Sequence, residues 1–309
     1  MFRANYITAF LVVCFLFNEG QTQELAIFKV SDFDLKGPVK MCTVVQSYGR
    51  EIFEFSPSGL LIKSTTKYNE SDSDITLYKY SGGYLMEKRL ESYKDGVLDP
   101  SSSMVNLFEI DSSKGKVIKE KIISLDKEFF EEQRYYLNED GDVERVVTSH
   151  QNAVDETKIE YTQLKGESTK STFENGILIQ TVRKSTKINK NKEKITITLV
   201  KEFLDGKPST AVETEHDEKG KILSKQLFLF DTGSKQFAPS ERLEFQYNAA
   251  GVLSKNIVHK GKAKSVKEYV FQFDDSPYKN WVKKIVAPEN TYVSRIITYF
   301  QEDPATEEN

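Results

Sequence analysis

The sequence is poor in several residue types that organise other folds. Its 309 residues include two cysteines, Cys14 and Cys42, one tryptophan and three histidines. Two cysteines, one of them in an N-terminal apolar run, do not make a disulfide framework. The histidines His150, His216 and His259 lack the H-x-x-x-H or H-E-x-x-H spacing that would place two on one metal ion. We therefore expect neither a disulfide-stapled domain nor a histidine metal site, and we interpret the histidines as solvent-facing.

Motifs of nucleotide-binding and acyl-transfer enzymes are also missing. There is no G-x-S-x-G, P-loop or G-x-G-x-x-G, and the glycines of the recurring pattern described below stand in turn-like segments. Adjacent carboxylates such as Glu131-Glu132, Glu139-Asp140 and Asp274-Asp275 would point to opposite faces of a strand, so they do not form a hydrolase dyad. The oxygen-rich turn 138–142 lacks the terminal Glu of a calcium loop. We expect no catalytic residue, no metal and no cofactor.

The chain lacks an excess of one charge. Its 43 Lys and Arg nearly balance its 47 Asp and Glu, for a net charge of -4. This balance argues against an electrostatic nucleic-acid binder. The stretch from Arg183 to Lys201 interleaves lysines with Ile and Thr, and Lys194–Leu199 alternates as a strand with one wet face. A polyanion-binding patch is the alternative interpretation of this stretch.

No apolar run reaches the roughly 20 residues of a membrane-spanning helix. Arg3 precedes an apolar run from Tyr6 to Phe17, and residues 18–23 are polar or small. We predict that residues 1–23 are a cleavable signal peptide, with a buried first helix as the alternative. The protein would then be secreted, periplasmic or associated with the outer membrane, and its mature chain would have no transmembrane span.

The two cysteines are interpreted separately. Cys14 follows Val13, where lipoprotein signals as a family carry Gly, Ala or Ser, and the apolar run continues past it. We therefore expect no lipid on Cys14. Cys42 lies in the apolar segment 39–45, where we expect a small buried hydrophobic residue.

Aromatic residues are abundant, with 15 Tyr and 20 Phe, and they recur in one pattern. An aromatic-x-aromatic pair is followed by turn residues, Gly, apolar residues and Lys, as in Phe53–Lys63, Tyr78–Lys88 and Phe245–Lys255. Rings spaced by two share one face of a strand. A turn residue such as Gly59 tolerates positive φ, and Asn280 occupies the same place in the last copy. Each unit therefore predicts a β-hairpin, and a lone hairpin is marginal in water.

The predicted fold is all-β: an antiparallel repeat array of hairpins forming one elongated or curved sheet, with little helix after the signal peptide. We expect an N-terminal cap segment at 24–47, the repeat domain at 48–300 and a disordered acidic tail at 301–309. Segments 69–74 and 189–194 are expected to be hairpin tips.

The closing stretch gives the most specific resemblance. Phe271-Gln272-Phe273-Asp274, Asn280-Trp281 and Arg295-Ile296-Ile297-Thr298-Tyr299 resemble the last repeat of YD or RHS-type bacterial secreted proteins. Phe173-Glu174-Asn175-Gly176 and similar segments resemble the MORN-variant repeats of antitoxin-like proteins. The resemblance covers roughly residues 48–300. It implies a β-repeat scaffold with no shared catalytic residue.

The sequence leaves three functional hypotheses. The first is a non-enzymatic protein that binds a protein or glycan at the cell envelope, through an exposed face or through loop tips. The second is an envelope-structural or lipid-carrier protein with a curved sheet around an apolar cavity, and the third is an enzyme with dispersed carboxylates. The aromatic pairs could stack on sugars, but we favour a shared apolar face, and we expect Trp281 to be a buried terminal residue.

Overall fold

The computed structural model describes residues 27–301 except 48, 112–115 and 151–152. Within these residues the only helical element is the short 3₁₀ turn η2 (Val30–Phe33). All other regular structure is antiparallel β-sheet. The strands are β1 (Val39–Gln46), β2 (Gly49–Phe55), β3 (Leu61–Lys67), β4 (Ser73–Ser81), β5 (Tyr84–Lys94), β6 (Val97–Leu98), β7 (Met104–Asp111), β8 (Val117–Ser124), β9 (Phe130–Leu137), β10 (Val143–Ser149), β11 (Val154–Leu164), β12 (Glu167–Glu174), β13 (Ile177–Ile188), β14 (Lys194–Leu204), β15 (Lys207–His216), β16 (Ile222–Asp231), β17 (Gln236–Tyr247), β18 (Leu253–Lys260), β19 (Ala263–Phe273), β20 (Trp281–Ala287) and β21 (Thr291–Tyr299).

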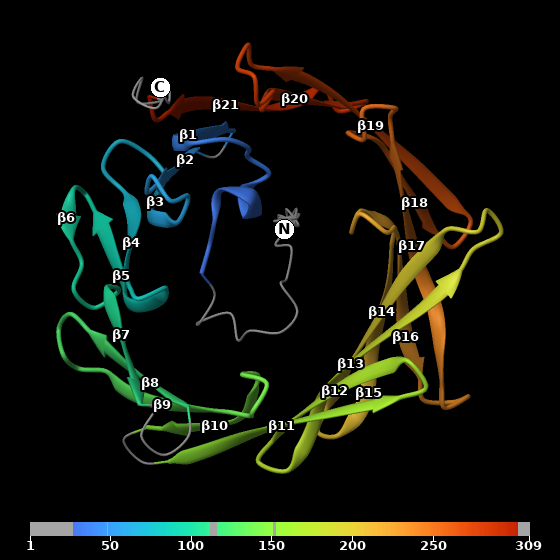
Figure 1. The fold of residues 1–309 in the computed structure, drawn as a ribbon, viewed down its shortest axis with the longest axis horizontal. Helices are drawn as coiled ribbons and strands as arrows, with labels where there is room; N and C mark the ends of the chain where they lie inside the picture. Colours follow the sequence, from blue (N-terminus) through green and yellow to red (C-terminus); the bar gives the residue numbers. More distant parts are fainter. Residues whose placement is uncertain (1–26, 48, 112–115, 151–152, 302–309) are drawn as a thin grey trace, which may run out of the picture.

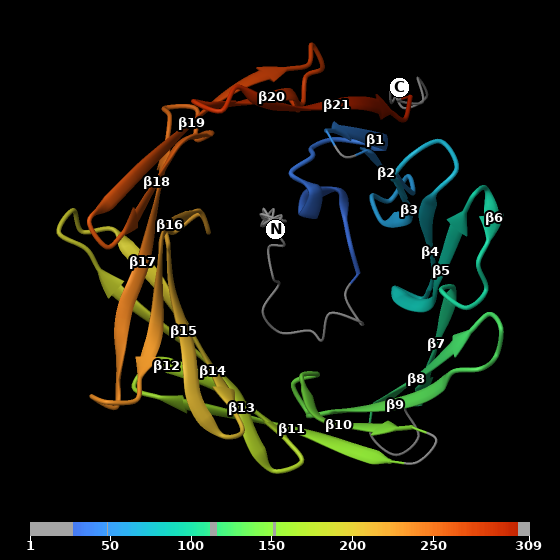
Figure 2. The same cartoon turned by 180° about the vertical axis from the view of Figure 1, so that it is seen from behind.

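The sheet closes on itself. Each strand pairs with the next along the chain, and β1 pairs with both β2 and β21, so the last strand meets the first. The two-residue β6 pairs only with β5, and β5 continues to β7. The result is a closed antiparallel barrel of twenty strands, visible as a ring from both sides (Figures 1 and 2).

The strand register assigns every side chain to one of two faces. Residues directly opposite each other on paired strands share a face, and successive residues alternate. Residues 27–38, called here the inner segment, lie inside the ring next to β1 (Figure 1). Val30 and Leu35 of this segment pack with Cys42 and Val44 of β1. The face that carries Cys42 is therefore the luminal face, and the register carries this assignment consistently around the ring.

Several hairpins turn on two residues, as between the paired residues Glu174 and Ile177. The turn residues Asn175 and Gly176 both have positive φ, 49° and 81°, which is the type I′ geometry that matches strand twist. Asp-Gly or Lys-Gly turns with the same signs of φ follow β5, β11 and β14. The aromatic-x-Asn-Gly segments that resembled repeat motifs are thus explained by hairpin turn chemistry.

The barrel wall has two unlike arcs. In the packed arc (β20, β21, β1–β5 and β7–β11) luminal side chains form two apolar clusters, one around Phe55 and one around Phe108. In the open arc (β12–β19), all of which the structure describes, the buried hydrophobic residues are Ile195, Ala211 and Ile257. The register places those three on the outer face. No luminal hydrophobic side chain of the open arc is buried.

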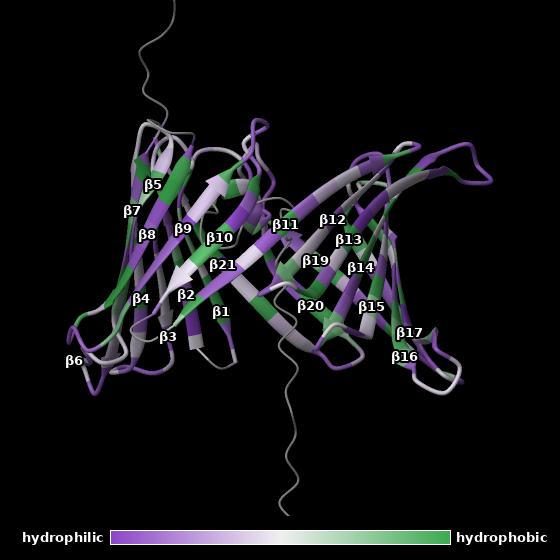
Figure 3. Cartoon of the chain, turned by 90° about the horizontal axis from the view of Figure 1, so that it is seen from below, coloured by the Kyte–Doolittle hydropathy of each residue, from purple (hydrophilic) through white to green (hydrophobic). Residues whose placement is uncertain are grey.

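The outer face of the barrel is charged around the ring. Ion pairs such as Lys63–Glu54 at 2.9 Å and Lys255–Glu268 at 2.9 Å join neighbouring strands there. Hydrophilic and hydrophobic residues are interspersed along the strands (Figure 3).

Two predictions about architecture are wrong. The chain is not an elongated or open curved sheet, and it is not a YD, RHS-type or MORN-variant repeat array, because its hairpins close into one barrel through the β1–β21 pairing. The all-β class, the antiparallel hairpins and the near absence of helix are confirmed. The predicted signal peptide (1–23), Cys14 and the tail from residue 302 lie outside the described residues, and the boundaries at 24–47 and 48–300 stay predictions.

Local predictions can be checked one by one. Phe53 and Phe55 both face the lumen in the first apolar cluster, as the spacing by two predicts. Gly59 takes a φ of 81°. Asn280 does not occupy the positive-φ position of its turn, because Lys279 takes it with a φ of 51°. The segments 69–74 and 189–194 contain hairpin turns, as expected.

Candidate functional site

The luminal face of the open arc carries no buried hydrophobic side chain. A ring of twenty strands lies in the size range in which side chains no longer fill the lumen. The inner segment packs against the opposite part of the wall. Luminal hydrophobic residues of the open arc are half-buried or exposed, with Ile188 at 66% and Leu229 at 51%.

Two parallel rows of luminal side chains cross the open arc perpendicular to its strands. The first is polar and runs from β13 to β16 through directly paired residues: Lys184, Thr198, Thr214 and Lys225. The second is apolar and crosses the same four strands: Val182, Val200, Val212 and Leu227. Neighbouring strands lie about 4.8 Å apart, so each row spans about 14 Å.

Luminal lysines outnumber luminal acids in the open arc away from the hairpin turns. The lysines are Lys170, Lys184, Lys225 and Lys267, and the acids are Glu202 and Glu241. Both acids have neighbours: Gln180 Nε2 donates to Glu202 Oε1 at 2.9 Å, and Lys260 Nζ lies 3.7 Å from Glu241 Oε2. Lys225 makes no ion pair with any residue in the described ranges. Lys267 Nζ lies 3.0 Å from Glu289 Oε1, and Lys170 and Lys184 also interact with other groups of the protein.

Outer-face charges of the same strands behave differently. Lys187 pairs with Glu215, Arg242 with Glu244 and Lys255 with Glu268. Arg242 and Glu244 lie on the same strand, Lys255 and Glu268 on adjacent strands, and Lys187 and Glu215 on strands two apart, so these charges neutralise each other locally. The predicted strand at Lys194–Leu199 is confirmed, and the face with Thr196 and Thr198 is the luminal one, but Thr198 is buried there, so the prediction of a solvent-exposed face is not borne out at this residue.

A buried polar cluster lies on the luminal side of the packed arc. Glu120 is fully buried, and Tyr135 is 1% exposed. Tyr135 Oη donates to Glu120 Oε2 at 2.7 Å, and Asn106 Nδ2 donates to Glu120 Oε1 at 2.6 Å. A buried carboxylate is tolerated when its oxygens are hydrogen-bonded. The cluster is enclosed by apolar residues and has no opening to a substrate, so its role is structural. In the sequence, the residues next to Glu120 along β8 did not indicate a buried polar cluster.

The closing stretch of the chain clamps the inner segment to the seam between β1 and β21. Asn280 is 2% exposed; its Nδ2 donates to the Lys36 carbonyl and its Oδ1 accepts from the Lys36 amide, both at 2.8 Å. Trp281 Nε1 donates to Asp34 Oδ2 at 2.8 Å. Arg295 lies 3.5 Å from the Trp281 ring centroid and donates to the Phe33 and Asp34 carbonyls. The motif that suggested a terminal repeat is a latch, and the buried position of Trp281 is confirmed.

Burial also changes the acidity of two groups beside this latch. Cys42 is 1% exposed, and burial raises the pKa of its thiol to about 11. Burial lowers the pKa of the Arg295 guanidinium, while Cys42 and Asp34 oppose that change. The expected buried, unreactive character of Cys42 follows from this environment.

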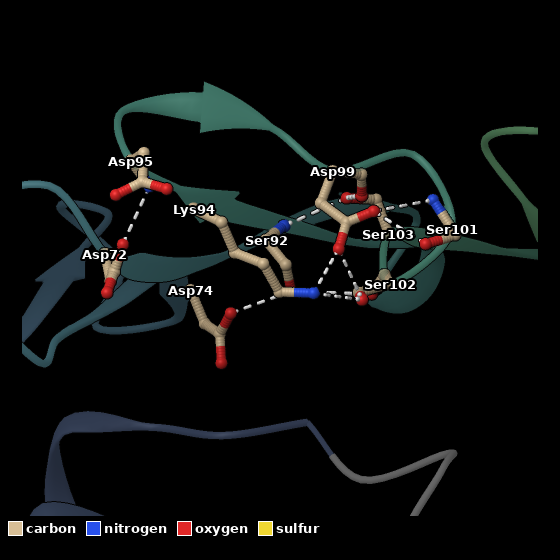
Figure 4. A network of polar contacts seen from close by, with 9 residues as sticks. All are labelled: Asp72, Asp74, Ser92, Lys94, Asp95, Asp99, Ser101, Ser102 and Ser103. Atoms are coloured by element: carbon tan, nitrogen blue, oxygen red, sulfur yellow. Dashed lines mark hydrogen bonds and ion pairs between the residues drawn. The ribbon is translucent and has the colours of Figure 1, made fainter.

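A second polar network holds the connection between β5 and β7 (Figure 4). The Asp99 carboxylate accepts from Lys94 Nζ and from the Ser101 and Ser102 hydroxyls. Ser103 Oγ donates to the Asp99 carbonyl at 2.7 Å and accepts from the Ser92 amide at 3.0 Å. These bonds lower the pKa of Asp99, with the bond from Lys94 contributing most. The network orders the loop between β6 and β7, and its polar groups form hydrogen bonds with one another.

The predicted candidate residues are scattered over the barrel. His150 lies between Glu131 and Asp155, with nitrogen–oxygen distances of 3.0 and 3.4 Å, while His216 ends β15 on the luminal face. His259 lies on the outer face of β18. The described residues contain no cluster of three or more His, Cys, Asp or Glu side chains arranged to hold a metal ion.

No protein-family model matches the chain, and no curated protein matches its sequence. The chain is similar to a porin-like protein from Bacteroides uniformis ATCC 8492, with 10% identity and a TM-score of 0.30 over 84% of this chain and 96% of that one. It is also similar to a porin-like protein from Bacteroides vulgatus ATCC 8482, with 9% identity and a TM-score of 0.24 over 85% and 99%. With TM-scores this low, neither structure bears on what this chain binds.

No helix among the described residues has the length and apolar character needed to cross a bilayer.

Proposed function

We propose that this chain is an exported, non-enzymatic binding protein of the cell envelope or its surroundings, and that its ligand is a glycan held against the luminal face of the open arc. Export is supported by the signal-like residues 1–23. The absence of a recognisable catalytic motif in the sequence supports a binding role over catalysis.

The observation that carries the proposal is the exposed luminal wall of β12–β19. Natural barrels of similar width have either a water-filled channel or a lumen plugged by part of the protein. Here the inner segment packs against only one arc of the wall. The exposed wall presents hydroxyl, amide and ammonium groups on a rigid sheet, which suits a ligand rich in hydroxyl groups. Tyr161, 40% exposed on the luminal face of β11, adds a ring on which a sugar could stack.

The lipid-carrier alternative predicts a continuous apolar cavity. The luminal row Val182, Val200, Val212 and Leu227 is apolar, but the next row contains Lys184 and Lys225. Along the strands, a polar row lies on each side of this apolar row. These four strands therefore offer no broad apolar surface to lipid chains. A glycan fits the alternation better.

The test uses two bulky substitutions on one strand. Val212 faces the lumen and its neighbour Glu213 faces outward. Binding of the purified protein to a panel of neutral and charged glycans is measured for the native chain, Val212→Trp and Glu213→Trp. We expect binding that Val212→Trp abolishes and Glu213→Trp preserves. Binding that both variants retain, or no glycan binding by the native chain, would overturn the proposal.

A further inference from the structure

We propose that the chain attaches to the surface of an anionic lipid bilayer through two neighbouring hairpin tips, the turn between β11 and β12 and the turn between β13 and β14. Each tip presents an exposed aliphatic side chain beside lysines. These residues, Leu164 and Lys165 on the first tip and Ile188, Lys190 and Lys192 on the second, are called here the lysine tips. The inference goes beyond the proposed luminal binding function and does not depend on it.

Both turns lie at the same end of the barrel, because successive strands are antiparallel and the turns are two strands apart. β13 and β14 pair as far as Ile188 and Lys194. The pairing of β12 with β13 stops at Lys184, and the pairing of β15 with β14 stops at Thr196. The second tip therefore extends four residues beyond Lys184, about 13 Å past the paired part of β12. A flat surface can reach it there.

Each tip exposes one large aliphatic side chain. Leu164 is 71% exposed and Ile188 is 66% exposed. They belong to opposite faces of the sheet, but each is the last residue of its strand, so both lie at the rim of the barrel. They are two strands apart, about 10 Å across the sheet. Burial of such side chains in the interfacial region of a bilayer is favourable.

The second tip has a surplus of positive charge. Its turn contains Lys190, Lys192 and Lys194 against one acid, Glu193. Within the described ranges, none of the three ammonium groups forms an ion pair with an acid of the protein. Glu193 Oε2 accepts from Asn189 Nδ2 at 2.7 Å and keeps its negative charge. The turn therefore presents a net charge of about two to its surroundings.

The tips on either side do not cancel this surplus. Lys165 is exposed beside Leu164. The acid of the first tip, Glu167, has its Oε2 atom 3.6 Å from Arg183 Nη1. The turn between β15 and β16 is balanced, with two acids and two lysines: Asp217, Glu218, Lys219 and Lys221. A cationic surface with two aliphatic residues remains at this end of the wall.

The opposite end of the barrel separates the two features. There Val154 is 68% exposed and Leu204 is 70% exposed, and each is followed by an aspartate. The lysines Lys262 and Lys264 are exposed in the turn between β18 and β19, which contains no large hydrophobic residue. An anionic bilayer suits the combination found at the lysine tips, because its phosphates attract the ammonium groups while its interfacial region takes up the aliphatic groups.

The negative charge of the whole chain does not oppose this attachment. The net charge is -4, but salt screens charges beyond about 8 Å at physiological ionic strength. β13 has twelve residues, which corresponds to about 40 Å, so the acids at the far end act weakly at the lysine tips. A soluble anionic polymer would meet the same lysines but would leave Leu164 and Ile188 in water. A bilayer is therefore the better occupant.

The first experiment separates charge from position. Co-sedimentation is measured with vesicles of phosphatidylcholine alone and of phosphatidylcholine mixed with phosphatidylglycerol. The variant Lys190→Gln with Lys192→Gln is compared with the control Lys262→Gln with Lys264→Gln. We expect the native protein and the control to bind the anionic vesicles only. Each lysine near an anionic surface contributes about fivefold, so the tip variant should lose at least about tenfold, and less at high salt.

The second experiment tests the aliphatic residues with the same anionic vesicles. Leu164→Ser with Ile188→Ser should lower the partition coefficient at least about tenfold at both low and high salt. The control Val154→Ser with Leu204→Ser removes two equally exposed residues at the opposite end and should bind like the native protein. Thermal unfolding of each variant shows whether a loss of binding reflects a loss of fold.

A fluorescent reporter then locates the contact. The native chain has one tryptophan, Trp281, which is buried, so Ile188→Trp and Leu204→Trp each add one exposed indole. We expect anionic vesicles to shift the emission of Ile188→Trp to shorter wavelength and to leave that of Leu204→Trp unchanged.

Four results would overturn the inference: equal binding to the neutral vesicles, equal losses in tip and control variants, vesicle binding without an emission shift of Ile188→Trp, or an emission shift that heparin alone reproduces. An emission shift that grows with protein concentration in the absence of vesicles would also overturn it, since the occupant of the lysine tips would then be a second copy of the chain.

Discussion

The packed arc and the open arc are built from the same hairpin, yet they are stabilised differently. In the packed arc the luminal rings of Phe55 and Phe108 are 2% and 3% exposed. In the open arc no luminal hydrophobic side chain is buried, and six of its eight strands have ten or more residues, against two in the packed arc. The open arc replaces side-chain packing with longer backbone hydrogen-bonded ladders.

The inner segment contributes to the packing of only one part of the wall. Its residues Val30, Phe33 and Leu35 fill the space in front of the seam strands, and they can reach only part of a ring this wide. Across the open arc the luminal hydrophobic side chains are half-buried or exposed, and lysine and threonine are found among them. This less covered wall is a consequence of the width of the ring.

The largest expected effect comes from removing one ring from each arc. Phe55→Ala deletes a buried side chain that contacts Phe33, with ring centroids 5.4 Å apart. We expect it to lower the free energy of unfolding by about 3–5 kcal/mol. Phe245→Ala, on the luminal face of the open arc, should lower it by less than half as much. Urea denaturation measures both, and equal losses would contradict the distinction between the arcs.

The buried carboxylate of the packed arc should show the next largest effect. Glu120→Ala removes the carboxylate that accepts from Asn106 Nδ2 and leaves Tyr135 Oη with Gln133 Oε1 as its acceptor, and we expect a loss of about 2–4 kcal/mol. Glu120→Gln keeps the shape and one acceptor and should lose about 1 kcal/mol or less. Glu160→Ala, an exposed outer-face partner of Lys158, is the control and should lose less than about 1 kcal/mol. A stabilised Glu120→Ala variant would refute the structural role of this cluster.

Cys42 offers a pH test of the seam. Burial raises the pKa of its thiol to about 11, whereas the unfolded thiol titrates near its model value of 9.0. The folded state therefore resists ionisation, so its stability is retained below pH 9 and declines as the pH rises from 9 toward 11. Two pKa units correspond to about 2–3 kcal/mol. The measurement is the unfolding free energy of the native protein minus that of Cys42→Ala at pH 8 and pH 10.5; a difference that does not change with pH would mean that the thiol is accessible to water.

Much of the local structure could be predicted from the sequence, because it depends on neighbouring residues. Rings spaced by two, as at Phe53 and Phe55, predict a common face, and a glycine such as Gly59 predicts the bend after them. Closure could not be predicted, since it depends on β1 meeting β21 across 250 residues of chain. A hairpin pattern is the same in an open sheet and in a barrel. The first and last strands contain no residue pattern that identifies the strand with which they pair.

Only part of the candidate site could be recognised in the sequence. The alternation at Lys194–Leu199 predicted a strand with a polar face, and the structure places that face in the lumen, where Thr198 is buried. The pairing of Lys184 with Thr198, and of Thr214 with Lys225, depends on registers that no local pattern fixes. The latch residues Asn280, Trp281 and Arg295 were recognisable as a motif, but their contact with Asp34 joins opposite ends of the chain.

The smallest effect concerns how the open arc is stabilised. Gly176 has a φ of 81° and open space around its Cβ position, so Gly176→Ala adds backbone strain without a clash, about 1 kcal/mol. Gly96, with a φ of 73° and equally open space, is the matched turn in the packed arc, and Gly233→Ala, at a glycine without positive φ, is the control. If ladders and turns hold the open arc, Gly176→Ala should speed hydrogen exchange along β12 and β13, while Gly96→Ala should leave the exchange of β5 unchanged because Leu85 anchors β5 in the Phe108 cluster. Equal local loosening in both arcs would mean that packing and ladders contribute alike around the ring.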